Sequence, residues 1–310
     1  MEHVAQKLDD MQKHIEPLFI NGLRGRMLRI KSKKRPDKEV LMVYGHHANL
    51  ERMYGLAEVF SDYGNVTMPD LPGFGGMDSF HTIGITPSID TLADYLSTFV
   101  KLKYRKKKVT IVAMSLGFAI TTRMLQRYPE LQKRVTILVS LVGFTRHDDT
   151  KLPKKLTRSY WALAMLFKHR VPSWLFLNLI LHPSVIRTFY AKTPNARSKF
   201  DHLSKEDKRR ALDFEVILWR DNDVRTYMIM ILEMLSLDNC NKQVRVPVHH
   251  VSVQGDQYFD NQVVEQHMRV IFENYSESKA VLPNHAPSIV ATKEEALPFV
   301  PKKLRTILAG

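Results

Sequence analysis

Apolar residues in the first half of the chain follow two alternating patterns. Short, largely apolar runs rich in Val, Ile and Leu recur, and between them apolar residues lie three or four positions apart. The runs predict strands over 39–45, 65–70, 108–115 and 134–144. Strands that are apolar on both faces are typical of the centre of a parallel sheet covered by helices. The alternation therefore predicts an α/β fold with a mostly parallel sheet and helices on both faces.

The segments between these runs have the spacing of amphipathic helices. We expect helices over about 49–60, over 88–102 and over 118–128, the last of them ended by a proline. Thr86 and Pro87 provide a plausible start signal for the second helix.

The pattern changes between residues 145 and 244. This stretch is rich in Leu, Met, Trp and Tyr, has helical spacing and contains no strong strand pattern. The alternation then resumes with an expected strand over 246–256, a helix over 260–275, a strand over 278–286 and a terminal helix opened by a capping box at Thr292 and Glu295. The simplest organisation is an α/β core of residues 1–144 and 245–310, interrupted by a helical cap of residues 145–244.

The composition of the 310-residue chain is that of a globular protein, with 44% hydrophobic and 25% charged residues. Its one cysteine, Cys240, excludes an intramolecular disulfide and a cysteine-based metal cluster. The N-terminus lacks the apolar region of a secretory signal, and the longest apolar stretches, 160–167 and 174–181, are too short to span a bilayer. We therefore expect a cytoplasmic protein.

The formal net charge of +14 is carried largely by basic clusters at 31–38, 101–108, 151–158 and 205–210. Such clusters are typical of solvated loops and helix ends, although they can also attract nucleic acid, anionic lipid or an acidic partner. The chain shows neither zinc-finger spacing nor an RNA-recognition signature, so no nucleic-acid partner is expected. Peripheral contact with an anionic membrane surface stays open, and the sequence does not indicate the oligomeric state.

Candidate chemistry begins where the strand over 108–115 ends in the sequence AMSLG. A serine on a sharp strand-to-helix turn, with small residues two positions away on either side, is the arrangement of a nucleophile elbow. Here Ala113 and Gly117 flank Ser115. Small residues and serine also occur at structural strand-to-helix junctions, so this pattern alone does not identify a nucleophile.

Two further residues have the positions that a serine nucleophile requires. A serine hydroxyl needs a histidine to accept its proton and a carboxylate to orient that histidine. After an elbow of this kind the partners are expected in the order acid, then histidine. Asp256 directly follows an apolar strand run, and His285 lies at the end of the next one. The segment between them has room for one helix and one strand.

Four segments together resemble the α/β-hydrolase fold superfamily. The most specific is DLPGFGGMDS (70–79), which is similar to the family's Asp-x-Pro-Gly-Phe-Gly-x-Ser loop. The others are EVLMVYGHHANLERM (39–53), similar to the oxyanion strand and loop, AMSLG (113–117), similar to the elbow, and LPNHAP (282–287), similar to the histidine loop. The chain departs from the family in having Tyr44 before Gly45, where histidine is usual.

The resemblance covers roughly residues 20–144 and 245–305. It implies an eight-stranded, mainly parallel sheet with the active site at its C-terminal edge, and it places 145–244 where the family has a lid or cap. It also implies a serine esterase or lipase-like member of the family.

The family's acid motif aligns with this chain in more than one way. When the family's acid motif is aligned backward from the start of the helix expected over 260–275, Asp256 takes the position of the acid. Phe259 then has the role of an apolar anchor, and Asp260 that of a helix N-cap. We therefore favour Asp256 as the triad acid, with Asp260 as the alternative. Asp148 or Asp149, which follow the expected strand over 134–144, are remoter candidates.

The family's oxyanion hole consists of two backbone N–H groups, one from the residue after the nucleophile and one from the loop after the third strand. By position these are the N–H groups of Leu116 and His46. Backbone donors do not depend on the identity of the side chain, so leucine at 116 is compatible with this role.

Two histidine pairs, at 46–47 and 249–250, could suggest a metal site. However, adjacent residues on a strand point to opposite faces, and no third ligand accompanies either pair at a suitable spacing. We expect no metal and no other cofactor. One histidine of each pair is expected to be packed and the other to lie near solvent.

The resemblance implies acyl transfer from an ester-type substrate. Ser115 attacks the carbonyl, His285 accepts its proton with Asp256 as its partner, and water then releases the acid. The apolar cap favours an apolar acyl chain, and with the nearby basic clusters it suggests a monoacylglycerol or lysophospholipid at an anionic surface.

Other functions remain open at this stage. A thioesterase, a C–C bond hydrolase or an acyltransferase could use the same three residues. A proline-iminopeptidase-like role is less favoured, because the usual Gly-Gly-x-Pro-Gly motif is missing. A non-catalytic relative that binds a ligand or partner with the same fold is a different class of alternative.

Overall fold

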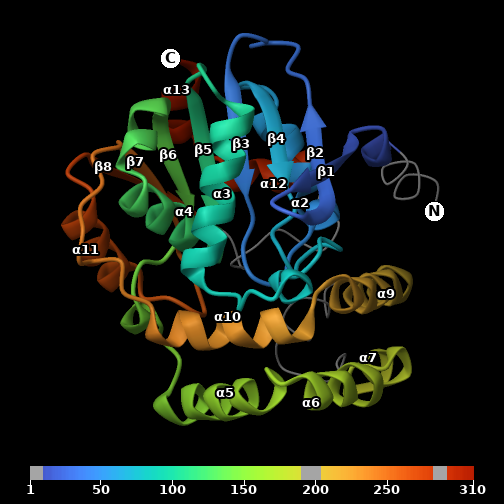
Figure 1. The fold of residues 1–310 in the computed structure, drawn as a ribbon. Coiled ribbons are helices and arrows are strands. Elements are labelled where there is room, and N and C mark those ends of the chain that lie inside the picture. The colour runs from blue at the N-terminus through green and yellow to red at the C-terminus, as the bar shows by residue number, and fades with distance from the viewer. Residues whose placement is uncertain (1–9, 190–203, 282–291) are drawn as a thin grey trace.

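The computed structural model describes residues 10–189, 204–281 and 292–310. These residues form one eight-stranded sheet with the strand order β1-β2-β4-β3-β5-β6-β7-β8 (Figure 1). The strands are β1 (Ile15–Ile20), β2 (Leu23–Ile30), β3 (Glu39–Val43), β4 (Asn65–Pro69), β5 (Val109–Met114), β6 (Val135–Leu141), β7 (Val248–Val253) and β8 (Tyr275–Ala280).

The sheet is mostly parallel, as the sequence predicts. Strands β3 to β8 pair in parallel, whereas β1 pairs with β2, and β2 with β4, in antiparallel orientation. The hydrophobic pattern did not identify β1 and β2 as separate strands. In β2 the reason is its sequence, LRGRMLRI, in which arginines separate the buried leucines Leu23 and Leu28.

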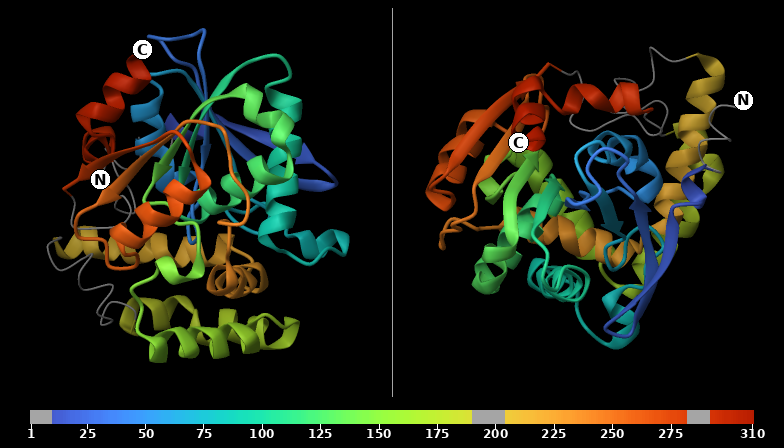
Figure 2. Two further views of the ribbon diagram at one scale, coloured as in Figure 1. Left: turned by 90° about the vertical axis from the view of Figure 1, so that its left-hand side faces the viewer. Right: turned by 90° about the horizontal axis from the view of Figure 1, so that it is seen from above.

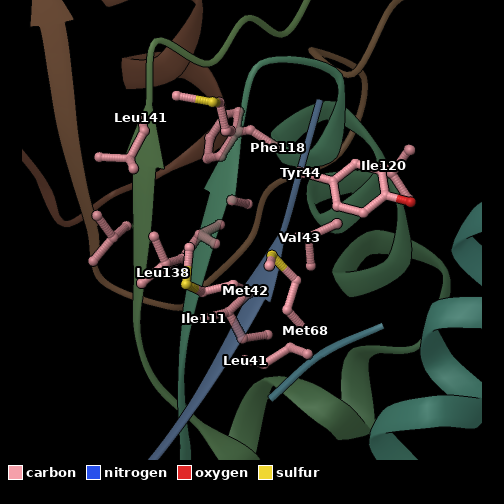
Figure 3. Packing of buried hydrophobic residues seen from close by; sticks show 14 of the residues in the cluster. Leu41, Met42, Val43, Tyr44, Met68, Ile111, Phe118, Ile120, Leu138 and Leu141 are labelled. Atoms are coloured by element: carbon pink, nitrogen blue, oxygen red, sulfur yellow. The ribbon is translucent and has the colours of Figure 1, made fainter. Parts of the chain in front are cut away.

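The central strands form the middle of the core. Val40, Leu41, Met42 and Val43 of β3 are all buried, which explains the continuous apolar run in the sequence. Their side chains pack against residues of β5, β6 and the adjoining helix, including Ile111, Leu138 and Phe118 (Figure 3). Full burial of each such side chain stabilises the fold by about 1.5–3 kcal/mol.

Helices cover both faces of the sheet. Helices α3 (Ile89–Lys103) and α4 (Leu116–Arg127) pack together on one face, and α2 (Leu50–Phe60) and α12 (Lys293–Ala296) on the other (Figure 1). Helix α3 begins one residue after the expected start at 88, and Thr86 and Pro87 do not cap it. Ser88 is the N-cap, because its side chain accepts a hydrogen bond from the N–H of Thr91.

The C-terminal part differs in detail from the expectation. Helix α11 spans Asn261–Ile271, and β8 begins three residues before the expected strand. The capping box at Thr292 and Glu295 is confirmed, but α12 is only one turn long. It is followed by a 3₁₀ turn (η6, Leu297–Phe299) and by α13 (Lys302–Ala309), because the prolines at 298 and 301 cannot donate backbone hydrogen bonds.

Helices also fill the described part of residues 145–244, in which no strand of the sheet occurs. They are α5 (Lys154–Phe167), α6 (Arg170–Leu175), a π-helical turn η4 (Phe176–Ile180), α7 (Pro183–Phe189), α9 (Lys205–Asp221) and α10 (Val224–Ser236). Helices α9 and α10 lie next to the α/β part, and α5, α6 and α7 form a layer beyond them (Figures 1 and 2). Of the described helices, none is long and apolar enough to cross a membrane.

Candidate active site

Ser115 occupies a strained turn between β5 and α4. Its backbone angles are φ 48° and ψ −119°, in a region that residues with a Cβ rarely adopt. Such a conformation costs on the order of 1–3 kcal/mol and persists only where its surroundings enforce it. Strand β5 ends at Met114 and α4 begins at Leu116, so the whole reversal is concentrated at the serine.

Two glycines allow the backbone to close around this turn. A Cβ at Gly117 would lie 2.4 Å from the carbonyl oxygen of Tyr44 and 2.5 Å from that of Val43, so α4 approaches the end of β3 too closely for any side chain. A Cβ at Gly45 would lie 2.9 Å from Cβ of Ser115. Glycine at both positions is therefore a steric requirement of the turn.

The loop after β3 lies beside the N-terminus of α4. A Cβ at Gly45 would stand 3.6 Å from the backbone nitrogen of Leu116, and His46 is the next residue. The N–H of Leu116 belongs to the first turn of a helix, where backbone donors have no intrahelical acceptor. This arrangement is suited to binding a negatively charged oxygen next to Ser115.

The DLPGFGG loop is held by a buried polar network. The carboxylate of Asp70, which is fully buried, accepts hydrogen bonds from the Tyr44 hydroxyl at 2.8 Å and from Nε of Arg26 at 3.0 Å. The Tyr44 hydroxyl also accepts a hydrogen bond from the N–H of Leu71. A Cβ at Gly75 would collide with Asp70 Oδ1, which explains the glycine. Tyr44, in place of the family's usual histidine, thus anchors this loop.

Helices α9 and α10 hold the same loops from the other side. Ser79 Oγ and Thr226 Oγ1 are hydrogen-bonded at 2.9 Å, and the N–H of Gly75 donates to Asn222 Oδ1 at 3.0 Å. These contacts place the helical segment over the carboxyl ends of the parallel strands.

The histidines after β3 contact these helices. Nε2 of His46 donates to the carbonyl oxygen of Tyr227 at 3.1 Å, and the two rings lie 3.8 Å apart. Burial lowers the pKa of His46 to about 3, so its imidazole is neutral at pH 7. Nε2 of His47 donates to Oε2 of the buried Glu215 at 2.8 Å, and its ring packs on Trp219. The sequence contained no signal for Glu215, Trp219 or Tyr227, because they lie in a separate helical segment.

Asp256 lies just beyond the end of β7 and is 5% exposed. Its Oδ1 accepts hydrogen bonds from the N–H groups of Tyr258 and Phe259, at 2.8 and 3.1 Å. The loop therefore fixes the orientation of this carboxylate at the same edge of the sheet as Ser115.

The sequence matches the protein family described as "Serine aminopeptidase, S33" over residues 34–279. This span includes the oxyanion loop, the DLPGFGG loop, the elbow and Asp256, and it covers most of the chain. The chain belongs to this family of α/β-hydrolases.

Solved structures with the same fold include esterases and lipases. An esterase from Exiguobacterium antarcticum has a TM-score of 0.65 at 14% identity, with 94% of this chain and 97% of that chain covered. A putative lipase from Acinetobacter baumannii AYE has a TM-score of 0.65 at 15% identity, covering 98% and 97%. A membrane phospholipase A described as a bacterial virulence factor has the same score and identity, covering 98% and 91%. At these identities the likeness shows the fold alone. Among curated proteins no significant match is found.

The other candidate acids of this α/β-hydrolase have structural roles. Asp260 is the N-cap of α11, as predicted, and accepts hydrogen bonds from the N–H groups of Gln262 and Val263. Asp149 is fully buried; its Oδ2 accepts from the N–H of Arg146, and its Oδ1 is 2.5 Å from Nδ1 of His267 on α11. Phe259, the expected apolar anchor, stacks on Phe144.

His285, the candidate general base, lies outside the described residues. The strand before it, β8, is parallel to β7, and Ala280 at its end is paired with Val253 at the end of β7. Strand β8 therefore ends at the edge of the sheet where the loop of Asp256 begins.

The histidine pairs differ from the expectation in two respects. His249 and His250 point in opposite directions, as predicted. His249 is hydrogen-bonded to Ser276 and Ser278 of β8, and His250 to Ser140 of β6. However, both are buried, so the expectation that one lies near solvent is wrong. His46 and His47 lie in a loop and not on a strand, since β3 ends at Val43.

Among the residues that the structure describes, one other group of side chains has a spacing that could hold a metal ion. Ligand atoms of Asp148, Asp149 and His267 lie within 4.8 Å of one another. The direct hydrogen bond between Asp149 and His267, together with the N–H donors that Asp149 binds, accounts for this cluster without an ion.

Proposed function

We propose that this α/β-hydrolase cleaves carboxylic esters of apolar acyl groups, with Ser115 as nucleophile, His285 as general base and Asp256 as triad acid. The observation that carries the proposal is the positive φ of Ser115 on a turn packed against Gly45 and Gly117. The proposal also assigns residues 1–144 and 245–310 to the catalytic core of a cytoplasmic protein and residues 145–244 to its lid.

The proposed reaction has two steps. Ser115 Oγ attacks the ester carbonyl while His285 takes its proton, and the N–H groups of His46 and Leu116 bind the oxyanion. His285 then protonates the leaving alcohol. In the second step His285 deprotonates a water molecule, which attacks the acyl-enzyme and releases the acid and Ser115.

Aromatic packing beside the oxyanion loop supports an apolar acyl group. His46 contacts the rings of Phe74 and Tyr227, and Tyr227 in turn contacts Trp219. These aromatic rings, together with the neutral imidazole of His46, favour burial of hydrocarbon next to the loop. The esterase and lipase structures with the same fold are consistent with this choice.

The family's description as serine aminopeptidases offers a second candidate function. Such an enzyme needs a carboxylate to bind the substrate's ammonium group. Glu215 is the buried carboxylate next to the oxyanion loop, and it is hydrogen-bonded to His47. This pairing favours the ester over the peptide substrate.

A series of p-nitrophenyl esters tests the proposed substrate class. From acetate to octanoate, kcat/KM is expected to rise by about tenfold for each two methylenes that become buried, since one buried methylene contributes about 0.8 kcal/mol. Leucine p-nitroanilide serves as the peptidase probe and octanoyl-coenzyme A as the thioesterase probe. Faster turnover of either probe than of any ester, or a steady decline with chain length, would overturn the proposal.

Asp256 and Asp260 are distinguished by matched substitutions. Asp256→Asn is expected to lower kcat on the preferred ester by about 10⁴-fold, because an amide no longer stabilises the charged histidine. Asp260→Asn removes the same charge four residues away, and asparagine is as good an N-cap as aspartate, so kcat and the melting temperature should hardly change. Equal, mild effects of the two substitutions would place the triad acid elsewhere.

A further inference from the structure

The outermost helices of the cap carry an exposed apolar surface. Its members lie on α5, α6 and η4, and each is between 49% and 67% exposed: Trp161, Leu163, Leu166, Val171, Trp174, Leu179 and Ile180. We call these seven residues the outer cap surface. They include two of the three tryptophans of the chain. Apolar groups of this size, gathered on one layer of a protein, mark an interaction site.

The side chains of the outer cap surface do not belong to the hydrophobic core of the cap. The same helices already bury another face: Ala164 is fully buried, and Phe167 and Phe176 pack on each other 4.4 Å apart. This inner face belongs to a small core shared with Val216 of α9 and Met228 of α10. Helix α10 separates α5 from the α/β part of the molecule (Figure 1). The side chains of the outer cap surface therefore stay exposed to solvent although the inner face of the same helices is already packed.

The outer cap surface lies in a strongly basic segment. Residues 151–180 contain no Asp or Glu and six cations: Lys151, Lys154, Lys155, Arg158, Lys168 and Arg170. Lys154 and Lys155 occupy the first turn of α5, where the helix dipole favours anions. Helix stability therefore does not explain their positions. Within the described chain, neither forms an ion pair.

We propose that the outer cap surface docks on an anionic phospholipid bilayer. Exposed tryptophan and leucine side chains together with lysine and arginine on the same helices are the composition of segments that lie in the membrane interface. In this orientation Trp161 and Trp174 enter the headgroup region while Lys154, Lys155 and Arg158 contact lipid phosphates. Since none of the described helices could span a bilayer, this contact is peripheral.

Charge argues against the other occupants of this surface. In a symmetric dimer the same surface would face itself, so the cations of one copy would oppose those of the other. A nucleic acid would pair with the cations but would leave the exposed tryptophan and leucine side chains without apolar partners.

Docking also fits the position of the candidate active site. The cap covers the carboxyl edge of the sheet, so docking through its outer layer turns that edge toward the bilayer (Figure 1). This consequence rests on the proposed function, whereas the docking itself does not depend on catalysis.

Vesicle binding by the full chain tests the proposal. The Ser115→Ala variant is used so that lipid cannot be hydrolysed, and it is sedimented with vesicles of phosphatidylcholine alone or mixed with phosphatidylserine. We expect binding to the mixed vesicles at least tenfold stronger than to phosphatidylcholine alone. In a Trp219→Phe background, the fluorescence of Trp161 and Trp174 is expected to shift to shorter wavelength on binding.

Matched variants locate the contact. Trp161→Ser with Trp174→Ser, and Lys154→Glu with Arg158→Glu, are each expected to weaken binding at least tenfold, since each basic residue near an anionic surface contributes about 1 kcal/mol. The controls are Phe19→Ser with Ile85→Ser, which are exposed outside the cap, and Arg105→Glu with Lys106→Glu, at the amino end of β5. The controls should bind within about twofold of the parent.

Three results would overturn the docking proposal. They are no binding to mixed vesicles, equal losses in cap and control variants, and a dimer in solution that the tryptophan substitutions dissociate. The two proposals fail separately. A chain that binds vesicles but cleaves no ester refutes only the proposed function, and one that cleaves soluble esters without binding vesicles refutes only docking.

Discussion

Ser115→Ala is expected to lower kcat on a p-nitrophenyl ester by at least about 10⁴-fold, because removing a triad nucleophile leaves only the catalysis provided by binding and the oxyanion hole. Labelling by a fluorophosphonate probe should disappear with it. The melting temperature should not fall, since alanine at φ 48° experiences the same backbone strain as serine and leaves no large cavity.

A serine remote from the elbow provides the control. Ser61 follows α2, and its hydroxyl donates to the backbone of Glu58. Ser61→Ala should leave labelling and kcat within about twofold of the wild type, as expected for a surface change away from the site. Persistent labelling of the Ser115→Ala protein would show that another residue is the nucleophile. Loss of labelling in both variants would indicate that impaired folding, and not loss of the nucleophile, abolishes the reaction with the probe.

Gly117→Ala is expected to destabilise the protein by about 3 kcal/mol and to reduce activity at the same time. The added methyl group would lie 2.4 Å from the carbonyl oxygen of Tyr44, a backbone atom that cannot turn aside, so α4 must move away from β3. That movement shifts Leu116 relative to the oxyanion loop. A displacement of about 1 Å at a catalytic group costs about 100-fold in rate.

Thermal unfolding and ester turnover measure these two effects. For a chain of this size we expect the melting temperature to fall by roughly 4–6 °C. Gly84→Ala is the matched control. Its φ is +74°, so alanine there is strained by about 1–2 kcal/mol, but no atom lies within 4 Å of the new methyl group. It should be destabilised less and retain normal kcat. A Gly117→Ala protein as stable and active as the wild type would contradict the close approach of α4 and β3.

Much of the fold could be predicted from local pattern. Largely apolar runs identified the five strands β3 to β7, because a strand buried on both faces needs few polar residues. The edge strand β8, YSESKA, was expected three residues too late, and β1 and the arginine-containing β2, which pair at the other side of the sheet, were missed. The predicted helix boundaries were least accurate where an N-cap determines the start of the helix, as at Ser88, or where prolines interrupt a helix, as at 298 and 301.

The candidate site was predictable in part. The spacing of small residues around Ser115 reflects a local steric rule, and the left-handed φ of that serine agrees with it. The N-cap role of Asp260 is local as well. By contrast, His47 and Glu215 are 168 positions apart in the chain, so no pattern in the sequence could pair them.

The α/β alternation, the tight turn at Ser115 and the DLPGFGG loop could be recognised from the chain alone, because each depends on residues a few positions apart. The proposed order of Ser115, Asp256 and His285 likewise depends only on chain order. The contacts that hold these parts together, Tyr44 with Asp70, His46 with Tyr227, and Gly117 against β3, are visible only in the folded chain. The same holds for the exposure of Trp161 and Trp174. Helical spacing shows which residues share a face, but burial depends on what folds against that face.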